Sequence, residues 1–213
     1  NSGGGKSTIV SLIPRFYEVS EGSIMIDGVD IRDVKQHDLR DKIGLVPQKG
    51  LLFSGTIRSN LTYGAPDATD EQLEEVIKVA QAKEFIDHKE EHLDSKISQG
   101  GTNVSGGQKQ RLAIARAIAK NPEIFIFDDS FSALDFKTDA MLRQELNKMI
   151  KKTKNTVLIV GQRIASIMSA DQIIVLDEGR IVGKGKHDEL MKDCKVYQEI
   201  AYSQLSKEEL GHE

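Results

Sequence analysis

The sequence predicts an α/β fold with a mostly parallel sheet, an antiparallel β portion and an inserted helical subdomain. Continuous apolar runs at 124–127 and 156–160 are typical of parallel strands covered on both faces. Helical patterns at 105–119 and 137–150 precede these runs. With 213 residues and 38% hydrophobic content, the chain is long enough for one such core. We therefore expect one domain over residues 1–213, with a helical subdomain at about 53–120.

The antiparallel portion is predicted to consist of two hairpins. Asp27 and Gly28 form a dipeptide typical of tight turns, and the runs 23–26 and 29–31 flank it. A second hairpin is predicted at 172–184, and the patterns after it indicate two short helices.

The middle of the chain is predicted to be helical. After a short buried strand at 43–46, the region 53–101 lacks strand patterns. Within this region, residues 67–82 begin with acidic residues and continue with the apolar spacing of an amphipathic helix.

The chain begins with NSGGGKST, which matches the end of a phosphate-binding loop, G-x-x-x-x-G-K-[ST]. The first glycine of the pattern would precede Asn1, so we expect an N-terminally truncated piece whose first strands are missing. Glycines allow backbone N–H groups to curl around phosphate oxygens. Lys6 would meet the β- and γ-phosphates, and Ser7 would offer its hydroxyl to Mg²⁺. The expected nucleotide-binding residues are Asn1, Ser2, Gly3, Gly4, Gly5, Lys6, Ser7 and Thr8.

A flexible glycine linker is the alternative interpretation of this start. A linker has no need for Lys-Ser-Thr followed by the apolar helical run at 9–13, so the phosphate-binding loop is favoured.

A second motif, with the sequence VSGGQ, spans 104–108 and runs into a basic, alanine-rich helix. Ser105 and the two glycines after it would form a helix N-terminus whose N–H donors can bind an anion. An ordinary helix cap explains Ser105 but not the paired glycines. Glycines weaken a helix start unless another group must approach closely.

With these motifs the chain resembles the ATP-binding cassette (ABC) family over essentially its whole length. The family signature reads LSGGQ, so Val104 is a mild departure, and the RLAIARA segment follows it as in the family. The resemblance implies a P-loop NTPase core that binds ATP and Mg²⁺. It also implies that the signature closes over the nucleotide on the P-loop of a second cassette, through Ser105, Gly106, Gly107 and Gln108.

Three further motifs follow the family's order. Gln48 matches the Q-loop glutamine, which helps to hold Mg²⁺ and the attacking water and senses the transmembrane domains. Asp128 matches the Walker B aspartate, so the resemblance implies metal-site residues Ser7, Gln48 and Asp128. The D-loop, which contacts the opposing domain, corresponds to Ser132, Ala133, Leu134 and Asp135.

Two positions depart from the pattern of hydrolysing cassettes. Asp129 stands where the family usually has the Glu that polarises the attacking water, and its side chain is shorter by about 1.5 Å. Gln162 stands at the switch position, usually His, and an amide cannot carry a proton. The catalytic positions are therefore Asp129, Gln162 and Gln48, in a chain expected to bind ATP better than it cleaves it.

This combination resembles one subunit of heterodimeric ABC exporters, in which one composite ATP site is degenerate. The expected partners are a second cassette and transmembrane domains fused upstream, which would place the chain at the cytoplasmic face of the cell membrane. No apolar run approaches the roughly 18 residues that span a bilayer, so any membrane part is expected outside this sequence.

Two alternatives stay open. One is a symmetric, fully hydrolysing transporter cassette. The other is a non-transport ABC ATPase of DNA repair or translation, but these typically carry a coiled-coil insertion or a second cassette, which 8–104 does not contain. The formal charge of −4 indicates no nucleic-acid partner. The single cysteine, Cys194, excludes an internal disulfide and fits a reducing cytosol.

Overall fold

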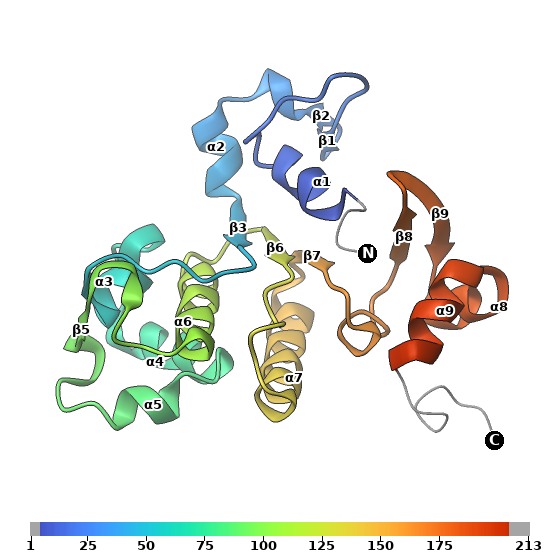
Figure 1. Cartoon of the computed structure of the whole chain (residues 1–213). Helices are drawn as coiled ribbons and strands as arrows, with labels where there is room; N and C mark the ends of the chain where they lie inside the picture. Colours follow the sequence, from blue (N-terminus) through green and yellow to red (C-terminus); the bar gives the residue numbers. More distant parts are fainter. Residues whose placement is uncertain (1–4, 205–213) are drawn as a thin grey trace. The chain divides into compact units, whose positions relative to one another are not determined.

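The structure is a computed structural model that describes residues 5–204 (Figure 1). The chain forms two compact units. One unit comprises Ser23–Leu158, and the other comprises Asn1–Gly22 together with Ile159–Glu213. None of the helices within residues 5–204 combines the length and apolar character that crossing a bilayer requires.

The chain forms a parallel sheet, as the sequence predicts. Strand β3 (Ile43–Val46) pairs in parallel with β6 (Ile124–Asp128), and β7 (Thr156–Val160) lies next to β6 in the strand order. Phe125, Ile126 and Phe127 are buried. The expectation that 156–160 is covered on both faces is wrong, because β7 is only half-buried at the end of this strand order.

The first predicted hairpin is confirmed. Strands β1 (Met25–Ile26) and β2 (Val29–Asp30) pair in antiparallel fashion. Asp27 (φ 51°) and Gly28 (φ 81°) both adopt the left-handed conformation that a type I′ turn requires. Helix α2 (Gln36–Asp41) follows and leads into the sheet.

The inserted region contains helices α3 (Ile57–Leu61), α4 (Asp70–Val79) and α5 (Lys83–Asp87). Helix α4 is shorter than the predicted 67–82, because the Thr69 hydroxyl caps it by accepting the Gln72 N–H. Short 3-10 helices also occur along the described residues, at Ile31–Asp33, Thr62–Gly64, His92–Asp94, Gln99–Gly101 and Ile164–Ser166.

Two short strands in this region correct the expectation that it has none. Strand β4 (Gly55–Thr56) pairs in antiparallel fashion with β5 (Lys96–Ile97). Two residues per strand are too few for the alternation that marks a strand in a sequence. Nearby, Arg58 bonds to Asp94 and Asp70, which braces α3 against the start of α4.

Helix α6 (Gly106–Ala119) contacts α3, α4 and β3 (Figure 1). Its side chains at Leu112 and Ile114 are fully buried. Helix α7 (Phe136–Thr153) extends beyond the predicted 137–150 at both ends and stops at Lys154, which is left-handed at φ 58°. Both predicted helices are thus confirmed with small shifts of their bounds.

The other unit contains α1 (Lys6–Leu12), the antiparallel hairpin β8 (Ile173–Asp177) and β9 (Arg180–Gly185), and helices α8 (His187–Asp193) and α9 (Lys195–Gln204). The predicted second hairpin and the two helices after it are confirmed. Tyr197 and the free thiol of Cys194 are buried in the cluster between hairpin and helices.

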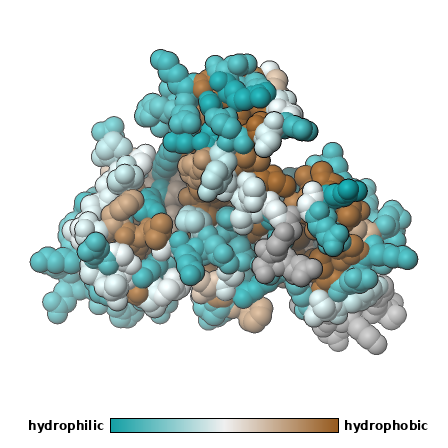
Figure 2. Space-filling model, turned by 45° about the horizontal axis from the view of Figure 1, so that its top comes forward, coloured by the Kyte–Doolittle hydropathy of each residue, from teal (hydrophilic) through white to brown (hydrophobic). Residues whose placement is uncertain are grey.

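Apolar side chains also reach the surface. The face seen in Figure 2 mixes hydrophilic and hydrophobic residues, and the exposed large apolar residues include Leu51, Phe53, Tyr63 and Phe136. Single exposed apolar residues are normal on protein surfaces, whereas contiguous apolar patches are typical of surfaces that contact a partner.

A buried hydroxyl ties the ends of the two central strands together. The Ser130 side chain is fully buried, and its Oγ donates to the Val46 carbonyl at 2.7 Å. Val46 ends β3 and Ser130 comes shortly after β6, so this bond fixes the distance between the segments that follow the two strands.

Replacing Ser130 by Ala should remove the partner of the buried Val46 carbonyl. We expect a loss of about 1–3 kcal/mol in the free energy of unfolding, measured by urea denaturation. Ser132→Ala is the matched control, because its hydroxyl also donates to a backbone carbonyl, that of Asp129 at 2.8 Å, but is exposed. Equal losses in the two variants would contradict the structural role of Ser130.

Candidate functional site

The sheet brings two of the three expected catalytic side chains together. Gln48 follows β3 and Asp129 follows β6, so both lie where parallel strands end, which is where open α/β sheets bind ligands. The Gln48 Nε2 donates to the Asp129 Oδ2 at 3.1 Å. Asp129 has a left-handed backbone (φ 49°), a conformation that Asp tolerates better than most residues.

The segment expected to form the D-loop, 132–135, folds back on Asp129. The Asp129 carbonyl accepts the Ser132 N–H at 3.3 Å and the Ser132 hydroxyl at 2.8 Å. Asp128, the expected Walker B aspartate, is half-buried at the end of β6. The backbone from the Walker B aspartate to the D-loop thus forms one tight turn.

Asp135 closes the D-loop by capping helix α7. Its Oδ1 accepts the Thr138 N–H at 2.9 Å. This backbone bond, with a further contribution from the Thr138 side chain, lowers the pKa of the Asp135 carboxyl. The ionised carboxylate also suits the positive end of the helix.

The signature motif forms the N-terminus of α6, as the sequence predicts. The Ser105 Oγ accepts the Gln108 N–H at 3.2 Å, and the Gln108 Oε1 accepts the Ser105 N–H at 3.1 Å. This reciprocal pair is a capping box, which gives Gln108 a role in shaping the helix start. The S-x-x-Q spacing is the sequence signal for it.

The two signature glycines have different surroundings. A Cβ at Gly106 would meet no atom within 4 Å, whereas a Cβ at Gly107 would lie 3.6 Å from the Ala133 carbonyl oxygen. The signature and the D-loop are therefore neighbours. Gly106 is exposed, and the packing of its own chain leaves room for a Cβ at this position.

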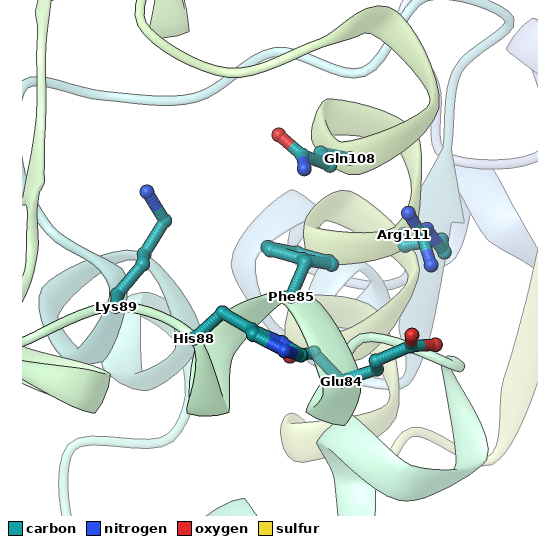
Figure 3. A pocket seen from close by; sticks show the side chains of 6 residues that line it. All are labelled: Glu84, Phe85, His88, Lys89, Gln108 and Arg111. Atoms are coloured by element: carbon teal, nitrogen blue, oxygen red, sulfur yellow. The ribbon is translucent and has the colours of Figure 1, made fainter.

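An open pocket of about 470 Å³ lies beside the signature helix (Figure 3). Gln108 and Arg111 come from α6, and Phe85 comes from α5. The Arg111 guanidinium lies 4.8 Å from the Phe85 ring centre, and its Nη1 donates to the Gln81 carbonyl at 2.6 Å. Burial lowers the pKa of Arg111, and these contacts hold the α5 region against α6.

Two glutamine side chains that the sequence motifs do not single out hold the backbone of predicted site segments. Gln110 in α6 bonds to the backbone on both sides of Gln48. Gln204 in α9 donates through Nε2 to the Gln162 carbonyl at 2.7 Å and accepts the Ile164 N–H at 2.9 Å. A single Gln in a helix carries no pattern that would reveal either contact.

The described residues of the expected P-loop belong to the unit that comprises 1–22 and 159–213, as does Gln162, whereas Gln48 and Asp129 belong to the unit Ser23–Leu158. Gly5 is left-handed (φ 77°) and precedes α1, whose first residue is Lys6. The Gly5 carbonyl accepts the Ile9 N–H at 3.0 Å, while Ser7 and Thr8 are exposed. The expected residues Asn1, Ser2, Gly3 and Gly4 lie outside the described residues.

The donor types expected from the sequence would suit Mg²⁺ bound with a nucleotide; Gln48 and Asp128 belong to one compact unit, and Ser7 belongs to the other. Mg²⁺ prefers oxygen ligands, keeps several waters and takes others from substrate phosphates. The expected metal-site residues Ser7, Gln48 and Asp128 offer a hydroxyl, an amide oxygen and a carboxylate. Within residues 5–204 no group of three or more His, Cys, Asp or Glu side chains forms a site that could hold a metal, so phosphate and water would have to complete the shell.

Comparisons with known proteins identify the family. The sequence pattern of the family described as ABC transporter matches residues 1–132. An uncharacterized ABC transporter ATP-binding protein of Mycobacterium tuberculosis is 46% identical over 99% of this chain, which covers 36% of that protein. YgaD of Bacillus subtilis, whose name describes multidrug export and an ATP-binding/permease protein, is 46% identical over 93% of this chain and 34% of its own length.

A solved structure agrees with these relatives. The ATP-bound structure of a bacterial Atm1-family ABC exporter matches 95% of this chain with a TM-score of 0.91 and 38% identity, and the match covers 35% of that protein. The chain thus spans about a third of the length of the proteins that it matches. With an α/β fold that is consistent with a P-loop NTPase cassette, this chain belongs to the ABC transporter family, whose members are ATPases that bind nucleotide with Mg²⁺.

Proposed function

We propose that this chain is the ATP-binding cassette of an asymmetric ABC exporter. It binds MgATP at its own P-loop, closes against a second, different cassette and supplies its signature motif to the partner's hydrolytic site. Its own site hydrolyses ATP slowly.

The open space at Gly106 carries this proposal. Gly106 is exposed, and a Cβ there would meet no atom within 4 Å apart from its chain neighbours and the adjacent backbone of its own helix. Glycine weakens a helix relative to Ala, so a glycine without a packing partner in its own chain supports the close approach of another molecule. Ser105 already accepts the N–H groups of Gln108 and Lys109, so the N–H groups of Gly106 and Gly107, the first two residues of α6, are the donors suited to a phosphate. Together these features support a nucleotide that approaches from another cassette.

The neighbouring D-loop supports the same partner surface. Gly107 lies against the Ala133 carbonyl, so the two motifs that contact an opposing cassette in this family lie side by side. Asp135 and Ser105 are exposed helix caps within these two motifs. One partner surface can therefore contact both.

Slow hydrolysis at this chain's own site is supported by Asp129 and Gln162. The Asp129 carboxylate is shorter than Glu by about 1.5 Å, and misplacement of a catalytic group by about 1 Å can cost on the order of a hundredfold in rate. Its Oδ2 also accepts a hydrogen bond from Gln48. The Gln162 amide can bond to a γ-phosphate but cannot carry a proton.

Exposed apolar side chains next to the Q-loop support contact with transmembrane domains. Leu51 is 64% exposed, Phe53 48% and Tyr63 71%. The Phe53 and Tyr63 rings stack with their centres 4.7 Å apart, which holds an aromatic surface in place. The name of the Bacillus subtilis relative, which describes multidrug export and a permease, supports an exporter with a transmembrane part. The cassette would then lie at the cytoplasmic face of the membrane.

The first test places a bulky cation at the signature. In the full-length exporter, Ser105→Arg should lower ATP turnover roughly a hundredfold, because it blocks the donors that stabilise charge on the partner's nucleotide. Thr69→Arg is the matched control, since Thr69 is an exposed capping-box residue of α4 outside the signature. Turnover that is the same in both variants would contradict the composite site.

The second test gives this chain's own site the two residues that hydrolysing cassettes usually have. Asp129→Glu with Gln162→His should raise single-turnover hydrolysis by more than the product of the single effects, because residues of one catalytic unit are non-additive. The measurement uses an exporter whose partner site is disabled at its catalytic Glu. If the unmodified chain already hydrolyses ATP as fast as the double variant, a symmetric, fully active cassette replaces the proposed function.

A further inference from the structure

The buried side-chain amide of Gln110, in the signature helix, bonds to the Q-loop backbone on both sides of Gln48. Gln110 is 1% exposed, its Oε1 accepts the Gly50 N–H at 2.7 Å, and its Nε2 donates to the Pro47 carbonyl at 3.0 Å. Gln48 lies between these two backbone contacts. Both ends of one amide are therefore used to hold the short segment that carries Gln48.

Two more contacts hold the Q-loop segment close to α6. A Cβ at Gly50 would lie 2.8 Å from the Lys109 carbonyl oxygen, so the backbone of the loop approaches the helix more closely than a side chain would allow. The Arg116 Nη2 donates to the Leu51 carbonyl at 2.8 Å. The loop is fixed along its length, and the Gln48 side chain projects from a held backbone toward Asp129.

We propose that Gln110 is a positioning residue of this chain's own ATP site. It sets the Gln48 side chain against Asp129 and thereby the affinity of the site for the Mg²⁺ that accompanies ATP. The inference rests on the proposed function, in which Gln48 helps to hold that ion. Partners that orient a metal ligand without touching the metal typically contribute about 10–100-fold to metal affinity.

The geometry requires an amide. Gln110 must accept from one backbone group and donate to another at the same time, which a carboxylate cannot do. In Gln110→Glu the carboxylate still accepts the Gly50 N–H, but its second oxygen faces the Pro47 carbonyl, so one contact becomes repulsive. The substitution keeps the volume of the side chain, replaces the donor by an acceptor and adds a buried charge, as the control substitution below also does.

Asn60 provides a matched control. It is fully buried, its Oδ1 accepts the Phe53 N–H at 2.9 Å, and its Nδ2 donates to the Phe53 and Thr56 carbonyls at 2.9 Å each. Asn60→Asp therefore removes the same kind of amide-to-carbonyl hydrogen bonds from a buried side chain, but these bonds hold the segment that follows the Q-loop. A loss of general stability should appear in both variants.

The experiment uses the full-length chain assembled with its partner half in lipid vesicles, with the partner's P-loop lysine replaced so that only this chain's site binds tightly. A fluorescent ATP analogue is titrated at increasing Mg²⁺ and also without metal. Gln110→Glu should raise the Mg²⁺ concentration for half-maximal binding about tenfold and leave the metal-free affinity unchanged. Asn60→Asp should change neither quantity by more than about twofold.

A double-variant cycle with Gln48→Ala decides whether Gln110 acts through Gln48. In the Gln48→Ala background, Gln110→Glu should have no further effect on the Mg²⁺ requirement. A further loss of similar size, or an equal change in Asn60→Asp, would overturn the positioning role. Failure of the part of the proposed function on which this inference rests, MgATP binding at this chain's own P-loop, looks different, because the unmodified site would then bind no MgATP at any Mg²⁺ concentration.

Discussion

The packing of α6 is the constraint on which the rest of the candidate site depends. The helix begins at the signature, contacts α3, α4 and β3, and holds the Q-loop backbone through Gln110 and Arg116. A rise of about 1.5 Å per residue places Gln110 roughly 6 Å along the helix from its first residue. The motif expected to face a partner and the loop expected to serve this chain's own nucleotide therefore share one rigid element.

A second constraint comes from the parallel pairing of β3 and β6. Because both strands end at the same edge of the sheet, Gln48 and Asp129 meet although 81 positions separate them in the sequence. The Ser130 hydroxyl fixes this edge from the buried side. The D-loop then turns back on the Asp129 carbonyl, so the proposed catalytic carboxylate and the partner surface are joined by a few residues.

Much of this arrangement could be predicted from the sequence, where a pattern has one physical cause. Buried apolar runs give β3 and β6, the Asp27-Gly28 pair gives its hairpin, and Ser105 starts α6. Features with weak or ambiguous local signals were not predicted. These are the two-residue strands β4 and β5 and the late start of α4. The backbone contacts of Gln110 and Gln204 were also not predicted, because the groups that they bond to lie far away in the sequence.

We propose that the exporter has two unlike ATP sites and that this chain's own P-loop retains ATP while the partner site turns over. Photo-crosslinking of a radiolabelled azido-ATP after many turnovers, followed by separation of the two halves, measures which nucleotide each site holds. We expect mainly triphosphate on this chain and diphosphate on its partner. Equal amounts of diphosphate on both halves would contradict it.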